Sequence, residues 1–210
     1  MTKTFLTSLL ALAFITSTQA GSESSPPTNF RDARARGFEK GALEIENVAG
    51  AFWFFDRGTH PDATLDLAVD SLRLGVMLSD PHGDGFFAGN SEFLGEVFGG
   101  PIFRGAGDIH AGATLIIRYN FFKPGARVIP YFQIGGGGVY TDISEEGSDG
   151  LVSLPVEFNL QGGFGLRFML NRQWSLLLEG GYRHISNASI KLPNEGVDQF
   201  GGQLGLGVFF

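Results

Sequence analysis

The chain has 210 residues, no cysteine and a formal net charge of −7. This length suits one domain, and the lack of cysteine excludes both a disulfide framework and a thiolate metal site. An acidic chain without a basic run is also poorly suited to nucleic acid, which proteins bind mainly through the phosphates.

Residues 1–20 have the pattern of a secretory signal peptide. A short apolar run, Phe5–Ile15, follows a positively charged start, and Ala20 ends a segment that suits cleavage. A membrane-anchoring helix is the alternative, but a bilayer span needs ~20 apolar residues and this run is shorter. We therefore expect a signal peptide over 1–20, a flexible lead-in over 21–37 and a single folded unit over 38–210.

Apolar and polar residues alternate with a period of two along that unit, which is typical of strands. In the stretch Val156–Phe168 the apolar residues occupy even positions, whereas Glu157, Asn159 and Arg167 occupy odd ones. A soluble sandwich alternates too, but so dense a polar face suits a membrane barrel, with its apolar face toward lipid and its polar face inward. Eight segments have this pattern: Glu39–Phe54, Leu65–Ser79, Phe86–Phe98, Ala111–Phe122, Val128–Tyr140, Leu154–Met169, Trp174–Ser186 and Asp198–Phe210.

These segments predict an all-β fold, an eight-stranded antiparallel transmembrane β-barrel of the outer-membrane type. Closure is expected because lipid offers no partner to the backbone groups of an open edge. In a barrel of this size side chains fill the interior. The polar residues expected to fill it are Glu157, Asn159, Gln161, Arg167, Glu179 and Arg183.

The connections are expected to alternate in length, with short turns in the periplasm and long loops outside. The predicted tight turns are 79–85, 123–127 and 170–173, and the predicted long loops are 55–64, 99–110, 141–153 and 187–197. In the second segment the apolar phase slips between Val69 and Leu72, which predicts a β-bulge near Asp70 and Ser71.

Aromatic residues near the predicted strand ends are expected to form girdles at the two membrane interfaces. They are Phe52 to Phe55, Phe121, Phe122, Tyr131, Phe132 and Trp174. The chain ends in Phe210, an aromatic on the outward face that looks like the signal recognised by barrel-assembly machinery.

The last two predicted strands carry three reactive side chains. Residues two apart in a strand point to the same side, so His184 and Ser186 share the apolar face of their strand, and Asp198 falls on the apolar face of the next strand. If the two strands form a hairpin, a base, a nucleophile and an orienting carboxylate meet on one surface. Glu195 is the alternative acid, but it lies within the predicted loop and off the matching register.

The same stretch resembles a known family. The run His184–Ala188, followed by Lys191, Pro193–Asn194, Gly196 and an acid at position 198, is similar to the C-terminal signature of the PagL-type lipid A 3-O-deacylases. The resemblance is specific over the C-terminal hairpin. It implies an eight-stranded outer-membrane barrel that hydrolyses an ester-linked acyl chain from lipid A.

The resemblance also implies roles for individual residues. His184 would be the base and Ser186 the nucleophile, while Asn194 would contribute to an oxyanion hole and Asn187 matches a second asparagine of the family. Two positions depart from the pattern. The acid is Asp198 instead of glutamate, and Ser189 replaces a glycine whose backbone amide helps to form the oxyanion hole. The amide of Ser189 can do the same only if the backbone angles suit a residue other than glycine.

Other polar residues receive simpler interpretations. His60, His82 and His110 are expected in solvated connections, and no spacing predicts a metal site or another cofactor. Glycines 135–138 are followed by no Lys-Ser/Thr and no helix, so we interpret them as a place of bending or tight packing instead of a phosphate loop.

The outer loops carry both signs of charge. Glu145, Glu146 and Asp149 form an acidic loop, for which a solvated surface is favoured over a divalent-ion site. Arg104 and Lys191 are weak candidates for contacts with lipid A phosphates.

Two functions remain open from the sequence. The first is a serine esterase that uses a Ser186–His184–Asp198 triad on the lipid-facing wall to remove a 3-hydroxyacyl chain from the 3-O position of lipid A. The second is a non-catalytic small barrel with a structural, adhesin-like or lipid-binding role. The expected partners are lipid A or lipopolysaccharide, outer-membrane lipids and the barrel-assembly machinery through Phe210; a homodimer is left open.

Overall fold

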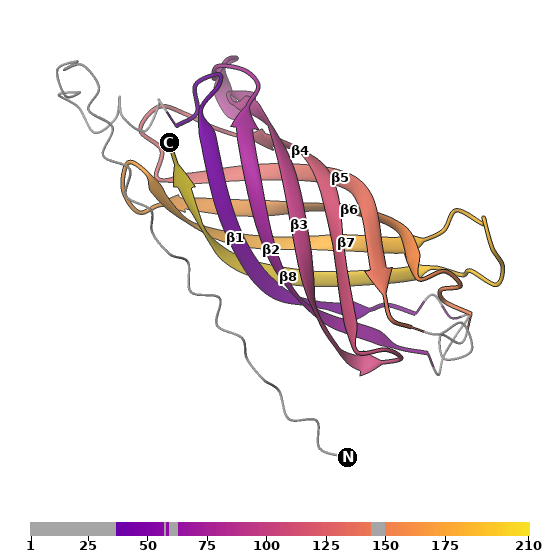
Figure 1. The fold of residues 1–210 in the computed structure, drawn as a ribbon. Helices are drawn as coiled ribbons and strands as arrows, with labels where there is room; N and C mark the ends of the chain where they lie inside the picture. The colour runs from indigo at the N-terminus through magenta and orange to yellow at the C-terminus, as the bar shows by residue number, and fades with distance from the viewer. Residues whose placement is uncertain (1–36, 57, 59–62, 144–149) are drawn as a thin grey trace.

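The protein is a closed β-barrel in which every strand pairs antiparallel with its chain neighbour and the last pairs with the first (Figure 1). The computed structural model describes residues 37–56, 58, 63–143 and 150–210. The strands are β1 (Leu43–Phe54), β2 (Leu65–Met77), β3 (Asn90–Gly105), β4 (Ile109–Asn120), β5 (Val128–Thr141), β6 (Val156–Met169), β7 (Trp174–Ser186) and β8 (Val197–Phe209). The predicted eight-stranded antiparallel barrel is therefore confirmed.

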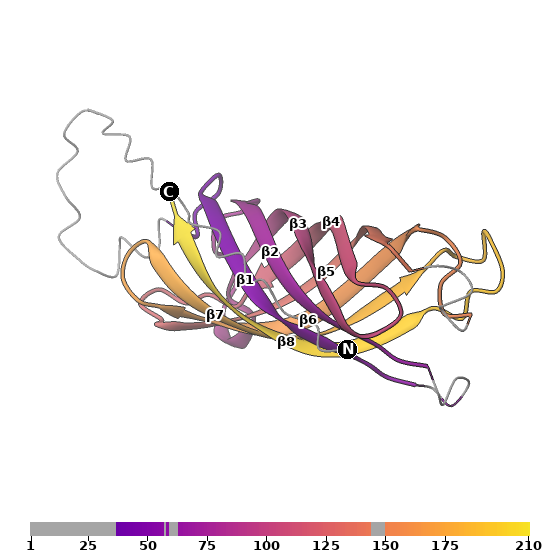
Figure 2. The ribbon, with the colours of Figure 1, turned by 60° about the horizontal axis from the view of Figure 1, so that its bottom comes forward.

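A short 3-10 helix, η1 (Gly85–Phe87), lies between β2 and β3. No helix in the described ranges has the length and apolar character needed to cross a membrane. The predicted signal peptide, and the lead-in up to residue 36, lie outside the described residues. The β7–β8 loop lies at the end of the barrel opposite the C-terminus (Figures 1 and 2).

The outer wall of the barrel is apolar, as the alternation predicts. On β6 the side chains of Val156, Phe158, Leu160 and Phe164 are between 50% and 70% exposed, whereas the intervening Glu157 is 4% exposed. A continuous apolar surface of this kind is characteristic of a wall that faces lipid. The six polar residues predicted for the interior all point inward, and five of them are buried; Gln161 is half-buried.

The predicted bounds of β3 and two connection lengths are wrong. The segment Phe86–Phe98 was expected as a strand, but β3 begins at Asn90 and continues to Gly105, and Phe86 lies in η1. Gly99 to Pro101 read as loop residues, yet they pair with Ile109 to Ala111 of β4. As a result the outer β3–β4 connection is only residues 106–108, and the periplasmic β2–β3 connection extends over 78–89.

The predicted bulge near Asp70 is also wrong. The β1–β2 register is continuous from Leu43↔Val76 to Phe52↔Leu67, and the irregularity in β2 lies between Asp66 and Leu67. The odd positions of β2 face inward along the whole strand, so the slip of the apolar phase does not come from a bulge. These inward residues are apolar near the outer end (Leu65, Leu67 and Val69) and polar toward the middle (Ser71 and Arg73), where buried polar side chains fill the lumen.

Three layers fill the lumen. The outer plug is apolar and consists of Phe52, Leu65, Leu67, Val69, Phe98, Ile102, Val139, Ile143, Leu151, Val152, Ile185 and Val197. The inner plug, near the periplasmic end, consists of Phe38, Met77, Phe122, Ile129, Met169 and Phe209. The ionic layer consists of Glu44, Glu46, Arg73, Glu92, Glu96, Arg118, Arg167, Glu179 and Arg183, all 0–6% exposed.

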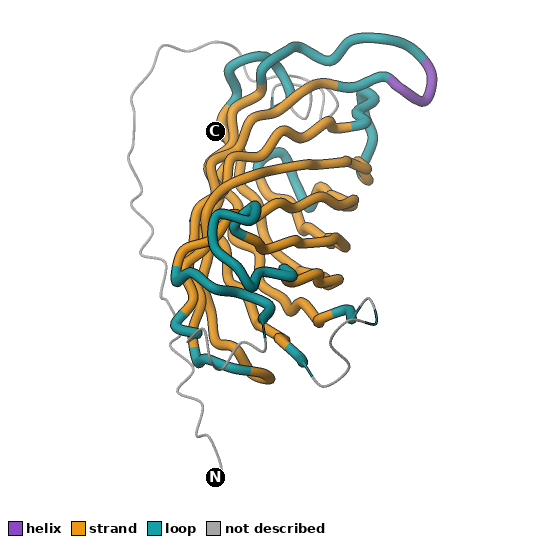
Figure 3. The backbone as a smooth tube through the Cα atoms, turned by 90° about the vertical axis from the view of Figure 1, so that its right-hand side faces the viewer, coloured by secondary structure: helices purple, strands orange, loops and turns teal. Residues whose placement is uncertain are grey.

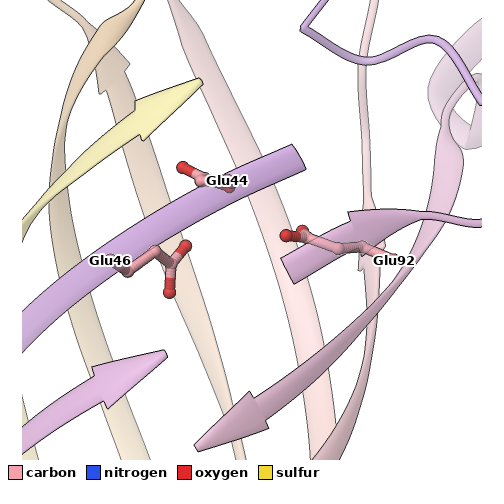
Figure 4. Close-up of side chains that lie close together, drawn as sticks. All are labelled: Glu44, Glu46 and Glu92. Carbon is pink, nitrogen blue, oxygen red and sulfur yellow. The ribbon is translucent and has the colours of Figure 1, made fainter. Parts of the chain in front are cut away.

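The ionic layer is held together by shared contacts. Glu44 and Glu46 of β1 and Glu92 of β3 bring carboxylate oxygens within 4.8 Å of one another (Figure 4). Arginines compensate this charge: Arg118 Nη2 lies 2.9 Å from Glu46 Oε2, and Arg167 Nη2 lies 2.6 Å from Glu44 Oε2. Buried charges of this kind remain tolerable only while each is paired and hydrogen-bonded.

Arg118→Met should therefore destabilise the barrel strongly. Arg118 donates to Glu46, Glu92 and Glu179, and its loss leaves these carboxylates undercompensated in the lumen. We expect a loss of about 3–5 kcal/mol in the free energy of unfolding. Arg104→Met is the matched control, because Arg104 is 70% exposed and its ion pair with Asp66 should contribute less than about 1 kcal/mol. Urea unfolding of both variants measures the difference, and equal midpoints would contradict a stabilising role for the ionic layer.

Candidate active site

The register of the last hairpin brings the three predicted groups together. His184 of β7 pairs directly with Asp198 of β8, and Ser186 lies two residues farther along β7. All three belong to the outward set of positions, together with exposed Phe200, Leu204 and Leu206 of β8. The reactive groups thus lie on the wall that faces lipid and not in the lumen.

The side chains form a continuous hydrogen-bonded series. His184 Nε2 is 3.0 Å from Ser186 Oγ, and His184 Nδ1 is 2.8 Å from Asp198 Oδ1. In the tautomer that donates from Nδ1 to the carboxylate, Nε2 is free to accept the serine proton. The His184 side chain is 25% exposed and that of Asp198 only 6%, so the carboxylate is shielded while the imidazole remains accessible.

Apolar side chains surround this series on the outer wall. Phe158 and Leu160 of β6 pair with Ser186 and His184, and both are half or more exposed. On the inward side, the hairpin neighbours Ile185 and Val197 pair with each other and belong to the outer plug. The hairpin is therefore supported from behind by the packed lumen, while its front is open to an apolar surface.

The sequence did not single out Tyr182 as a member of the site. Its hydroxyl donates to Asp198 Oδ1, the same oxygen that His184 Nδ1 contacts. Tyr182 lies two residues before His184 and diagonally across from Asp198 in the hairpin. That spacing on one strand face is the signal that could have identified it.

The β7–β8 loop, residues 187–196, closes the outer end of the site. Gly196 has φ +81°, a backbone conformation that favours glycine. A Cβ at this position would also lie only 2.9 Å from His184 Cε1, so a larger residue would crowd the imidazole. Ala188 and Ser189 also have positive φ, 53° and 64°. Ser189 thus adopts the left-handed conformation that glycine favours, at a cost of about 1 kcal/mol or more. In the described part of the chain its backbone N–H has no hydrogen-bond acceptor.

The two loop asparagines are engaged within the loop itself. Asn194 Oδ1 accepts from the backbone N–H of Asn187 at 3.0 Å, and Asn194 Nδ2 donates to Glu157 and to the Leu151 carbonyl. The Asn187 side chain is 1% exposed and its Nδ2 donates to Ser153 Oγ at 2.9 Å. Both asparagines therefore hold the loop against the β5–β6 connection.

Glu157 is the common acceptor of these contacts. Its carboxylate accepts from the backbone N–H groups of Ser153 (3.0 Å) and Leu154 (3.2 Å) and from Asn194 Nδ2 (3.0 Å). The sequence predicted Glu157 only as lumen filling. Its inward position near the end of β6 lets it join two outer loops that are distant in the chain.

Other residues singled out by the sequence lie away from this series. Glu195 is exposed in the loop and its backbone N–H donates to Gly150. Lys191 is exposed in the same loop, whereas Arg104 is the second-last residue of β3 and pairs with Asp66. Arg104 therefore lies on a strand remote from the β7–β8 hairpin.

The prediction for one histidine is wrong. His110 was expected in a solvated loop, but it is 1% exposed in β4 with Nε2 2.8 Å from the Ala68 carbonyl. The cause is the β3–β4 pairing, which continues past the expected loop. His82 is exposed in a connection, as predicted. His60 and the acidic outer loop of residues 145, 146 and 149 lie outside the described residues.

The sequence profile of the family described as "Lipid A 3-O-deacylase (PagL)" matches residues 74–207. This range covers more than half of the chain. The chain belongs to this family. A comparison with curated proteins gives no match.

Two solved structures with TM-scores above 0.5 support the fold. The crystal structure of Neisserial surface protein A (NspA) has a TM-score of 0.56 and 14% identity, covering 81% of this chain and 100% of that one. The N-terminal β-barrel domain of Pseudomonas aeruginosa OprF has a TM-score of 0.51 and 14% identity, covering 81% and 98%. The crystal structure of the outer membrane enzyme PagL has a TM-score of 0.49 and 18% identity, covering 77% and 97%. The protein is an outer-membrane barrel of this small type.

Glu157→Ala should loosen the loop beside the site. The change removes the acceptor that several donors share, and a loss of about 2 kcal/mol corresponds to roughly 30-fold faster amide exchange over residues 187–196. Hydrogen–deuterium exchange of the folded barrel, followed by mass spectrometry, measures this rate. Glu195→Gln, which alters an exposed carboxyl group of the same loop, should leave the rate unchanged. Equal exchange in Glu157→Ala and the unmodified protein would rule out Glu157 as the anchor.

Proposed function

We propose that the protein is an outer-membrane serine esterase that hydrolyses the ester-linked 3-hydroxyacyl chain at the 3-O position of lipid A. One observation carries the proposal: His184 contacts both Ser186 and Asp198 on the lipid-facing wall, at 3.0 and 2.8 Å. Membership of the lipid A 3-O-deacylase family supports the reaction class and the substrate.

In the proposed reaction, Ser186 Oγ attacks the ester carbonyl carbon while His184 Nε2 removes the hydroxyl proton. Asp198 holds the imidazole in the required tautomer and stabilises the imidazolium. The tetrahedral intermediate then collapses, the bond to the sugar oxygen breaks, and His184 donates its proton to that oxygen. Water, deprotonated by His184, attacks the acyl-enzyme and releases a 3-hydroxy fatty acid and free Ser186.

The oxyanion that forms on the carbonyl needs a hydrogen-bond donor. Asn194 Nδ2 already donates hydrogen bonds to Glu157 and to the Leu151 carbonyl. We therefore assign Asn194 and Asn187 the role of positioning the loop. The backbone N–H of Ser189 is the donor that remains. Ser189 has φ 64° and its N–H has no backbone acceptor among the described residues, and one such donor stabilises the transition state by roughly 3 kcal/mol.

Tyr182 is proposed as a positioning residue. Asp198 is one methylene shorter than glutamate, and a carboxylate held only by His184 would keep more rotational freedom. The Tyr182 hydroxyl donates to the same oxygen, Oδ1, and so restrains the carboxylate that orients the imidazole. This second contact offers a reason why the shorter acid suits this chain.

The position of the site fits its proposed partners. Lipid A occupies the outer leaflet, and the site lies at the loop end of β7 and β8 beside exposed Phe158 and Leu160. An acyl ester can therefore reach Ser186 without leaving the membrane.

We further propose that the barrel-assembly machinery recognises the exposed Phe210 during insertion. A homodimer is compatible with this arrangement, but no contact argues for one.

Ser186→Ala and His184→Ala should each reduce the release of 3-hydroxy fatty acid from purified lipid A by more than about 10³-fold, because the members of a triad act as a unit. Mass spectrometry of the lipid and of the released acid measures the reaction. Ser91→Ala, on the outward face at the periplasmic end of β3, is the matched control and should retain full activity. Release at the unmodified rate by either site variant would overturn the assignment and leave a non-catalytic barrel as the function.

Tyr182→Phe should lower kcat about tenfold and leave KM unchanged, because the ring and its packing on Phe200 remain while the hydrogen bond to Asp198 is lost. Tyr140→Phe, which alters an exposed tyrosine on β5, is the control and should change neither constant. A change in KM alone would argue that Tyr182 contacts the substrate instead of restraining the carboxylate.

A further inference from the structure

The loop between β2 and β3, residues 78–89, leaves two large apolar side chains uncovered. Phe86 and Phe87 of η1 are 71% and 72% exposed, among the most exposed large hydrophobic residues in the described structure. Figure 3 shows η1, in purple, at the tip of a loop that extends away from the strands. Two adjacent phenylalanines in such a position are unfavourable in water, and an exposed apolar patch of this kind marks an interaction surface.

The loop has a defined shape. His82 and Gly89 exchange backbone hydrogen bonds of 2.9 and 3.0 Å, which narrow it into a hairpin-like arm. The Tyr119 hydroxyl donates to the Phe87 carbonyl at 2.7 Å and ties the tip of the arm to β4. A Cβ at Gly89 would lie 2.0 Å from the Asn120 carbonyl oxygen, so the base of the arm also packs closely on β4. The two rings are thus held in place at the surface.

The exposed rings continue the lipid-facing wall of the barrel. Tyr119 belongs to the outward positions of β4, and its ring centroid is 5.2 Å from that of Phe121. Phe121 is 5.5 Å from Phe86, and Phe86 is 5.3 Å from Phe87. Four aromatic rings therefore run without a break from the wall onto the arm, and aromatic side chains are the ones that proteins place at membrane interfaces.

We propose that residues 78–89 form an aromatic foot that binds the periplasmic leaflet of the outer membrane, with Phe86 and Phe87 inserted at the boundary between phospholipid headgroups and acyl chains. The occupant is a phospholipid surface, because the foot extends a wall that already faces lipid and lies at the periplasmic end of β3 and β4. The polar residues Asp80, His82 and Asp84, which precede the rings, remain on the water side.

Single tryptophan reporters test the foot in the intact barrel. The chain has two tryptophans, Trp53 and Trp174, which are first replaced by phenylalanine. Phe87→Trp, and separately Phe86→Trp, is then introduced, and the barrel is folded into phosphatidylcholine vesicles with or without dibrominated acyl chains. Leu115→Trp on the mid-wall of β4 and Arg172→Trp in the β6–β7 turn are the references for lipid and water.

The proposal expects blue-shifted emission for both foot reporters and quenching by brominated lipid at least half as strong as for Leu115→Trp. Emission and acrylamide quenching equal to those of Arg172→Trp, without quenching by brominated lipid, would overturn it. Two reporter positions guard against a variant that fails to fold.

Discussion

Backbone hydrogen bonding in lipid is the constraint on which this structure depends. The bilayer core offers no partner to an unpaired N–H or C=O group, so the sheet must close. Pairing of β8 with β1, from Glu44↔Phe209 to Phe54↔Gln199, completes the cylinder. Once it is closed, the alternation of side chains assigns each residue either to the lumen or to lipid.

The assignment explains how a polar site coexists with an apolar wall. Charged side chains that point inward pair with one another in the ionic layer. Polar side chains that point toward lipid must be few, and each needs a hydrogen-bond partner. His184, Ser186 and Asp198 meet this condition through their mutual contacts. Behind them, Ile185 and Val197 pack in the outer plug, which limits movement of the hairpin. A packed support of this kind maintains the separations that the proposed proton transfer requires.

The two ends of the barrel use the same lipid-facing surface differently. At the outer end the loop 187–196 is fastened by Glu157 and leaves a serine accessible beside Phe158. At the periplasmic end the arm 78–89 is fastened by Tyr119 and exposes the rings of Phe86 and Phe87. In both places a side chain of a neighbouring strand holds the loop: the inward Glu157 of β6 at the outer end, and the outward Tyr119 of β4 at the periplasmic end.

Prediction from the sequence succeeded where the signal is local. The alternation in β6 and β7 gave the correct inward and outward residues because neighbouring side chains of a strand point in opposite directions whatever the strand pairs with. It failed at Gly99–Pro101 and at His110. Glycine and proline carry little strand signal, and these residues extend β3 and β4 only because the two segments pair with each other. The apparent phase slip in β2 reflected the change from outer plug to ionic layer, which depends on residues from all eight strands.

For the site, the sequence by itself determined that His184 and Ser186 share a face, and that Asp198 lies on the outward face of the next strand. Only the tertiary structure decided that Asp198 pairs opposite His184, that Tyr182 contacts the same oxygen, and that Glu157 secures Asn194 across 37 residues of chain. The physical reason is that alternation is a property of one strand, whereas register and loop contacts arise from closure of the barrel.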